Sequence, residues 1–142
     1  MEDFIHYFRK SLDIKEVNPR QYSPLVLAYI GDSVFDLIIK SKVVGDGNAP
    51  VNKLHRRTSS YVKASAQANT FRKIQNILTE EEMSIFKRGR NAKSGTVPKN
   101  ADLIEYKVAT GFEALIGFLF LENRFERIIE LVVEGVEHDR AN

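Results

Sequence analysis

The chain has 142 residues, a formal net charge of +2, three histidines and no cysteine. A domain of this length buries enough apolar surface to fold without a disulfide or a metal. The lack of cysteine excludes disulfides, zinc–thiolate sites and cysteine nucleophiles. The N-terminus is charged, and the longest apolar stretches, 25–30 and 114–121, are too short to cross a membrane. We therefore expect a single domain over residues 1–142 in the cytoplasm.

The first half of the chain has helical patterns. An amphipathic helix is expected over residues 3–12. Ser23-Pro24 has the pattern of an N-cap followed by proline in the first turn, so a long helix should run from there to about residue 42. Pro50 begins a further helix, which we expect to continue into the 70s.

The second half continues the helical pattern. Thr79 and Glu82 have the spacing of a capping box, and glutamates in a first turn complement the helix dipole, so residues 80–82 have a structural role. Glycines and a proline predict a loop over 89–100. Helices over 101–121 and 124–137 complete an all-α domain of about six helices, because no segment alternates as a half-buried strand does.

Positive charge is concentrated in the middle of the chain. Residues 47–101 carry eleven lysines and arginines against three glutamates, a net charge of +8, which leaves −6 for the two ends together. A basic region of this length suits a polyanion such as nucleic acid. For any single residue in it, a solvated surface charge is the alternative interpretation.

Two of the expected helices, 25–39 and 111–121, are too apolar for the surface of a domain. Their charged residues are Asp32 and Asp36 in the first and Glu113 in the second. A helix that is apolar on all sides is buried, and a buried carboxylate needs a partner. Glycines in both helices allow a close approach, which would bring Asp32 and Glu113 together where the helices cross.

Two carboxylates at close range repel each other, so a cation is their natural partner. Oxygen ligands without cysteine favour Mg²⁺, with Mn²⁺ as a substitute, over zinc. The alternative is that Asp32 and Glu113 are structural, each held by a backbone amide or an arginine. Asp36 also has a simpler role open to it, an ion pair with Lys40 four residues later.

Two segments resemble motifs of a known family. Residues 27–35, LAYIGDSVF, resemble the signature helix of ribonuclease III catalytic domains. Residues 112–121, FEALIGFLFL, resemble that family's second acidic motif, and the order and separation of the two motifs also match. The resemblance spans residues 23–122.

The basic loop at 87–100, KRGRNAKSGTVPKN, is most similar to the Mini-ribonuclease III branch, and segments 52–56 and 62–68 support this. That branch has a catalytic domain without an attached double-stranded-RNA-binding domain. The larger enzymes carry two further acids, where this chain has Leu25 and Thr110. Asp36 and Asp102 are possible helpers for the reduced acidic set.

The resemblance implies a homodimeric, all-α fold of the ribonuclease III catalytic type. It implies a Mg²⁺-dependent endoribonuclease that cuts double-stranded RNA to 5′-phosphate and 3′-hydroxyl ends. Asp32 and Glu113 match the essential acidic pair and are the expected catalytic and metal-binding residues. The branch further implies maturation of precursor 23S ribosomal RNA ends, with a ribosomal protein as a possible partner.

RNA contacts are expected from the basic middle of the chain. His55 lies next to two arginines, so we expect it to contact phosphate rather than to act in catalysis. The residues expected to bind RNA are His55, Arg56, Lys87, Arg88, Arg90, Asn91, Lys93, Lys99 and Asn100.

Two other functions remain open. The first is a non-catalytic RNA-binding or ribosome-associated module on the same fold, for which Leu25 and Thr110 are the best support. The second is an all-α interaction protein whose apolar helices form a dimer core. The second function leaves the charge segregation and the paired motifs unexplained.

Overall fold

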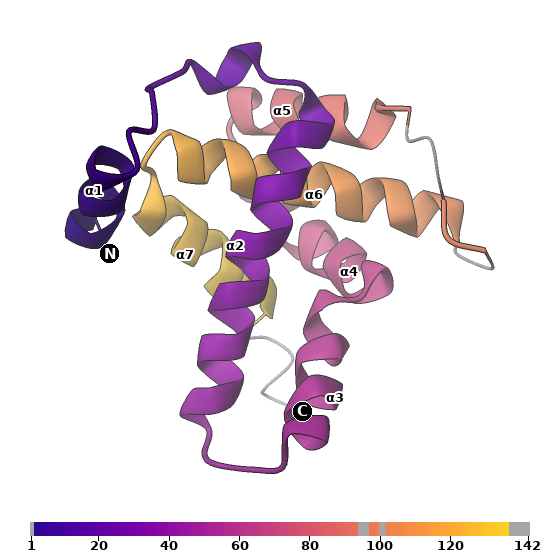
Figure 1. Ribbon diagram of the computed structural model, residues 1–142. Coiled ribbons are helices and arrows are strands. Elements are labelled where there is room, and N and C mark those ends of the chain that lie inside the picture. Colours follow the sequence, from indigo (N-terminus) through magenta and orange to yellow (C-terminus); the bar gives the residue numbers. More distant parts are fainter. Residues whose placement is uncertain (1, 94–96, 100–101, 137–142) are drawn as a thin grey trace.

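The computed structural model describes residues 2–93, 97–99 and 102–136, which form an all-α fold without a strand in these ranges (Figure 1). The helices are α1 (Glu2–Ser11), α2 (Pro24–Gly45), α3 (Val51–Val62), α4 (Ala64–Ile74), α5 (Glu80–Asn91), α6 (Leu103–Leu121) and α7 (Phe125–Val136), with 3₁₀ turns η1 (Pro19–Gln21) and η2 (Gln75–Ile77). The all-α prediction is confirmed. None of the helices described is long and apolar enough to span a membrane.

The predicted helix starts at Ser23 and Thr79 are confirmed. The Ser23 hydroxyl accepts a hydrogen bond from the Leu25 N–H at 3.2 Å, and Pro24 stands in the first turn of α2. At α5 the Glu82 N–H donates to the Thr79 hydroxyl at 3.1 Å, and the Thr79 N–H donates to the Glu82 carboxylate at 2.9 Å. These starts are predictable because a cap needs only neighbouring residues.

Two predicted boundaries are wrong. The helix expected from Pro50 into the 70s is two helices, with Lys63 in extended backbone between them (φ −64°, ψ 156°). The loop expected over 89–100 begins later, because Gly89 lies inside α5. A Cβ on Gly89 would lie 2.8 Å from the Ala114 Cβ, so this glycine permits close packing of α5 on α6 instead of ending a helix.

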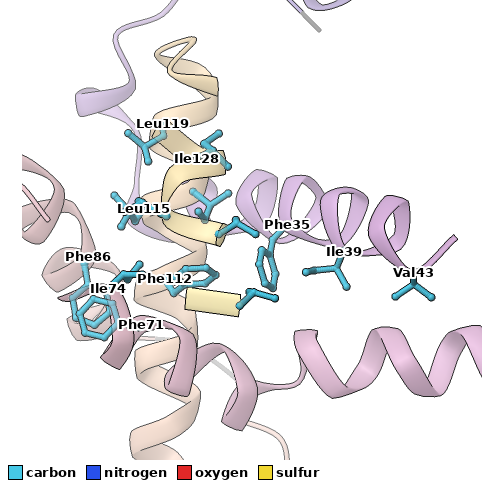
Figure 2. Packing of buried hydrophobic residues seen from close by; sticks show 14 residues of the cluster. Phe35, Ile39, Val43, Phe71, Ile74, Phe86, Phe112, Leu115, Leu119 and Ile128 are labelled. Carbon is cyan, nitrogen blue, oxygen red and sulfur yellow. The ribbon is translucent and has the colours of Figure 1, made fainter. Parts of the chain in front are cut away.

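Helix α6 lies at the centre of the core, with α2, α4, α5 and α7 packed around it (Figure 1). Figure 2 shows Phe112, Leu115 and Leu119 projecting from α6 into the main apolar cluster. Phe112 meets Phe35 of α2 edge to face, with ring centroids 5.1 Å apart. The prediction that this helix is buried on most sides is confirmed, since nine of its residues are buried.

Helix α2 differs from its prediction, because one of its apolar faces is exposed. Val26, Tyr29, Leu37 and Val44 share one side of the helix and are 48%, 82%, 56% and 63% exposed. We call these four residues the α2 stripe. Apolar composition does not reveal which neighbour covers each face, and in the single chain α3, α5 and α6 cover only part of α2.

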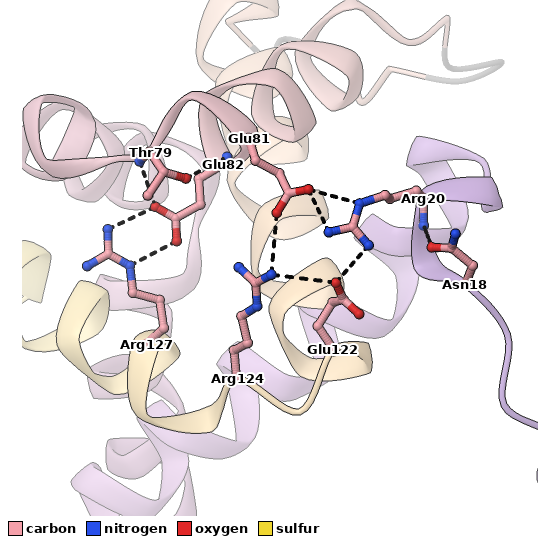
Figure 3. Close-up of polar contacts among 8 residues, drawn as sticks. All are labelled: Asn18, Arg20, Thr79, Glu81, Glu82, Glu122, Arg124 and Arg127. Carbon is pink, nitrogen blue, oxygen red and sulfur yellow. Dashed lines mark hydrogen bonds and ion pairs between the residues drawn. The ribbon is translucent and has the colours of Figure 1, made fainter.

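An ion-pair network fastens the start of α5 to η1, α6 and α7 (Figure 3). Glu81 pairs with Arg20 at 2.6 Å and with Arg124 at 3.4 Å. Glu82, which is 3% exposed, pairs with Arg127 at 2.8 Å. Burial alone would raise the pKa of Glu82, but hydrogen bonds from Arg127 and Thr79 lower it overall. The structural role predicted for the glutamates at this helix start is thus confirmed for Glu81 and Glu82.

Candidate active site

The site lies where α2 crosses α6, and glycines set the distance between the two backbones. A Cβ on Gly31 would lie 1.8 Å from the Glu113 carbonyl oxygen, and one on Gly117 would lie 1.9 Å from the Leu27 carbonyl oxygen. Both distances are far below van der Waals contact, so only glycine fits at either position. The close approach that the two glycines predicted is present.

This crossing brings Asp32, which follows Gly31, to the side chain of Glu113. Asp32 lies close enough to the Glu113 carboxyl to shift its pKa. Burial, followed by the hydrogen bond and the charge of Asp32, raises the pKa of Glu113 to about 8. In the metal-free chain Glu113 therefore holds its proton more strongly than an ordinary glutamate does.

The two carboxyl groups differ in exposure. Glu113 is partly buried on α6, whereas Asp32 is exposed on α2. The expectation that both acids would be buried is wrong for Asp32, because α2 is covered on one side only. The result is an acidic pair with one member in the protein and the other open to a ligand from solvent.

Gln67 of α4 is the third polar residue at the site. Its side chain is buried, and its Nε2 donates to the Val62 carbonyl at 2.8 Å and to Glu113 Oε2 at 3.5 Å. The latter hydrogen bond favours the ionised form and lowers the pKa of Glu113 against the larger effects that raise it. The sequence showed Gln67 only as part of the segment 62–68, and no local pattern marks it as a site residue.

The two possible helpers have other partners. Asp36 forms an ion pair with Lys40 at 2.9 Å, as its spacing predicted. Asp102 caps α6 by accepting a hydrogen bond from the Glu105 N–H at 3.1 Å. Thr110, where the larger enzymes have an acid, donates its hydroxyl to the Tyr106 carbonyl at 3.0 Å. Across the part of the chain that the structure describes, no group of three or more potential metal ligands is gathered, so the acidic pair stands alone.

The chemistry of the pair fits a hard divalent cation. Two neighbouring carboxyl groups repel each other once both are ionised, and the raised pKa of Glu113 reflects that repulsion together with burial. Protonation of one group would relieve the repulsion. A divalent cation would relieve it equally well, and carboxylate oxygens are ligands that Mg²⁺ and Mn²⁺ accept. With two protein ligands, the site leaves several coordination positions for water and for a ligand's own oxygens.

The predicted RNA-binding residues fall into two groups. His55 and Arg56 are exposed on α3, whereas Lys87, Arg88, Arg90 and Asn91 lie in the last turns of α5. Lys93 and Lys99 follow α5 in the chain, on either side of residues 94–96. Figure 1 shows these two places well apart, with α4 and α6 between them. The predicted residue Asn100 lies outside the described residues, as do Ser94 and Thr96 of the same loop.

At the end of α5, the side chains of two arginines are held by contacts within the chain. Arg88 donates to the Tyr22 carbonyl at 3.1 Å, and Arg90 donates to the Asn91 side chain at 3.1 Å. The Arg90 guanidinium also lies 5.7 Å from the centroid of the Phe86 ring. None of these contacts neutralises the arginines, so their positive charge remains available to an anion. Lys87, Lys93 and Lys99 are exposed.

Comparisons with known proteins agree with this architecture. The ribonuclease III domain family matches residues 25–124, a range that includes both carboxylates. The chain is 52% identical to the Mini-ribonuclease 3 of Thermoanaerobacter sp. (strain X514), over 81% of this chain and 83% of that protein. It is 47% identical to the Mini-ribonuclease 3 of Clostridium tetani, over 87% and 84%. A crystal structure of a protein from Fusobacterium nucleatum superposes with a TM-score of 0.70 at 36% identity, covering 82% of this chain and 95% of that one.

Proposed function

Since the chain belongs to the ribonuclease III family and to its Mini-ribonuclease 3 branch, we propose that Asp32 and Glu113 form the active site of an endoribonuclease. Enzymes of this family cut double-stranded RNA and are generally metal-dependent. The observation that carries the proposal is the glycine-lined crossing of α2 and α6, which places Asp32 close enough to Glu113 to raise its pKa.

Asp32 and Glu113 would hold Mg²⁺, for which Mn²⁺ is a substitute. When bound, such an ion supplies positive charge at the scissile phosphate and acidifies a water that can attack phosphorus. The raised pKa of Glu113 opposes the ionised form that would bind a cation, so cation binding should be favoured by rising pH. The products would be 5′-phosphate and 3′-hydroxyl ends.

The two basic groups would hold the duplex. Proteins contact double-stranded RNA mainly through its phosphates and 2′-hydroxyls, which suits the exposed charges on α3 and at the end of α5. Binding should weaken steeply as salt rises, because each phosphate contact releases counterions. Alanine at Arg56 or Lys87 should each lower the slope of log affinity against log salt by about one, and unchanged slopes would remove that residue from the interface.

We also propose that the α2 stripe is covered by the same stripe of a second copy. Large apolar side chains exposed along one face of a helix mark a candidate interface, and a two-fold homodimer is the commonest way to cover one. Asp32 lies on the same helix beside the stripe, so dimerisation would bring two acidic pairs to one assembly, one for each RNA strand. Leu37→Lys should therefore shift the molar mass measured by light scattering from dimer to monomer. A dimer retained by Leu37→Lys would place the interface elsewhere.

The natural substrate proposed for the chain is the duplex formed by the ends of precursor 23S ribosomal RNA, with a ribosomal protein as a possible accessory partner. Similarity to the Mini-ribonuclease 3 branch is the support for this step.

The direct test is incubation with duplex RNA, single-stranded RNA and duplex DNA in Mg²⁺, with a chelator control and end mapping. We expect cleavage of duplex RNA alone, new 5′-phosphate ends, and no cleavage with the chelator. Retention of duplex RNA without cleavage would instead support the non-catalytic RNA-binding module. That alternative is favoured by Leu25 and Thr110, which stand where the larger enzymes have acids.

A further inference from the structure

Gln67 is a buried polar residue whose role the proposed reaction does not explain. It lies on α4 with 2% of its surface exposed, in contact with one of the two site carboxyls. Its side-chain oxygen is buried and has no hydrogen-bond partner among the residues described. An unsatisfied buried acceptor lowers stability, and an apolar side chain of similar length would avoid that cost. Since the oxygen makes no hydrogen bond within the described part of the chain, any role of the Gln67 amide must come from its nitrogen, which makes two.

The break between α3 and α4 determines which way this amide points. Lys63 is extended, and the backbone N–H of Gln67 donates to the Lys63 carbonyl at 3.0 Å, in the first turn of α4. The side-chain Nε2 of Gln67 donates a hydrogen bond to the carbonyl of Val62, at the end of α3, at 2.8 Å. A carbonyl can only accept, so it binds the nitrogen end of the amide and excludes the oxygen end.

The same nitrogen has a second hydrogen, and it is directed at Glu113 Oε2, 3.5 Å away. This distance is at the long end for a hydrogen bond. Hydrogen bonds to the carboxylate of a metal ligand are charge-assisted and stronger than neutral ones, so the amide is placed to orient Glu113 Oε2.

We propose that Gln67 is a positioning residue that, anchored on the Val62 carbonyl, holds the Glu113 carboxylate against Asp32 in the arrangement that takes up a divalent cation. The inference rests on the proposed function of the acidic pair. Gln67 acts through Glu113 and itself touches neither the cation nor the RNA.

Gln67→Met tests this role, because methionine keeps the length of the side chain and removes both donors. The matched control is Thr70→Val, one turn further along α4. Thr70 is 4% exposed, and its hydroxyl donates to the Ala66 carbonyl of its own helix at 3.0 Å. Both variants remove one buried polar group from α4, and only the first removes a contact with Glu113.

The main readout is the affinity of the metal-free, RNA-free protein for Mn²⁺, measured by calorimetry beside a thermal melt. Loss of a group that orients a metal ligand typically costs 10- to 100-fold in affinity, so we expect a fall of roughly that size for Gln67→Met. The Mg²⁺ concentration for half-maximal cleavage should rise with it, while KM for duplex RNA stays unchanged. Thr70→Val should keep the parental Mn²⁺ affinity.

Parental Mn²⁺ affinity in Gln67→Met would overturn the inference, as would an equal loss in Thr70→Val. Should Gln67→Met not fold, Gln67→Asn replaces it. Its amide is one methylene too short to span Val62 and Glu113, so it should also lose affinity, and parental affinity there would again refute the role. If the proposed function itself is wrong, the unmodified chain should bind Mn²⁺ no better than Asp32→Asn does. That outcome is distinct from a loss of affinity in Gln67→Met alone.

Discussion

Gly31→Ala is the sharpest test of the helix crossing, because it adds a single methyl group between two backbones. That carbon would lie 1.8 Å from the Glu113 carbonyl oxygen and 2.7 Å from the Gly117 nitrogen. Ordinary contact begins near 3.4 Å. Neither neighbouring atom belongs to a flexible side chain, so α2 and α6 must move apart for the methyl group to fit.

Added atoms in a packed core cost about 1–3 kcal/mol, and a clash with backbone belongs at the upper end of that range, roughly 3 kcal/mol. For a chain of this size that corresponds to a fall of about 10 °C in melting temperature. Separating the helices also takes Asp32 away from Glu113. We therefore expect the pKa of Glu113 to fall towards its ordinary value and Mn²⁺ affinity to drop together with stability.

The control is Gly45→Ala, in the last turn of the same helix, where an added Cβ meets nothing within 4 Å. Alanine is the better helix former, so this variant should melt at or slightly above the parental temperature. Thermal denaturation followed by circular dichroism, with Mn²⁺ calorimetry, compares the three proteins. A melting temperature of Gly31→Ala within about 2 °C of the parent would refute the close crossing.

Two further predictions concern charge. In the metal-free chain the raised pKa of Glu113, about 8 against an ordinary 4.5, means that stability falls as pH rises between these values, because the folded state retains a proton that the unfolded state releases. Glu113→Gln removes that dependence. The free energy of unfolding of the variant, relative to that of the parent, should therefore increase by on the order of 3 kcal/mol between about pH 5 and about pH 8.5, and its relative melting temperature should rise with it. A difference that stays constant with pH would contradict the raised pKa of Glu113. Glu82→Ala removes the buried partner of Arg127 and half of the capping box, and urea denaturation should show a loss of about 1.5–3 kcal/mol. Glu80→Ala in the same turn should lower the free energy of unfolding by less than about 1 kcal/mol. Equal losses in the two variants would show that the Glu82–Arg127 pair does not stabilise the fold.

Features that depend on neighbouring residues were predictable from the sequence. The caps at Ser23 and Thr79 and the Asp36–Lys40 pair need only residues within one helical turn. The meeting of Asp32 with Glu113 was predictable for a related reason. Each acid stands near a glycine on an apolar helix, and two such helices pack most closely where their glycines meet.

The features that were missed depend on tertiary packing. Neither glycine nor proline marks the break at Lys63, so helical periodicity continues across it. Gln67 acquires its contacts only because that break places it beside the Val62 carbonyl, so its role could not be read before the break was known. The exposure of the α2 stripe was hidden as well, because periodicity shows that a face is apolar but not what covers it.

The central claim is that Asp32 and Glu113 together perform the cleavage. Single-turnover cleavage of an end-labelled RNA duplex in Mg²⁺ tests it with Asp32→Asn, Glu113→Gln and the matched control Asp36→Asn, which removes an acid from the same helix whose partner is Lys40. We expect each of the first two to lose roughly a hundredfold or more in rate while remaining folded, and the control to keep the parental rate. Parental cleavage rates in both Asp32→Asn and Glu113→Gln would contradict the claim.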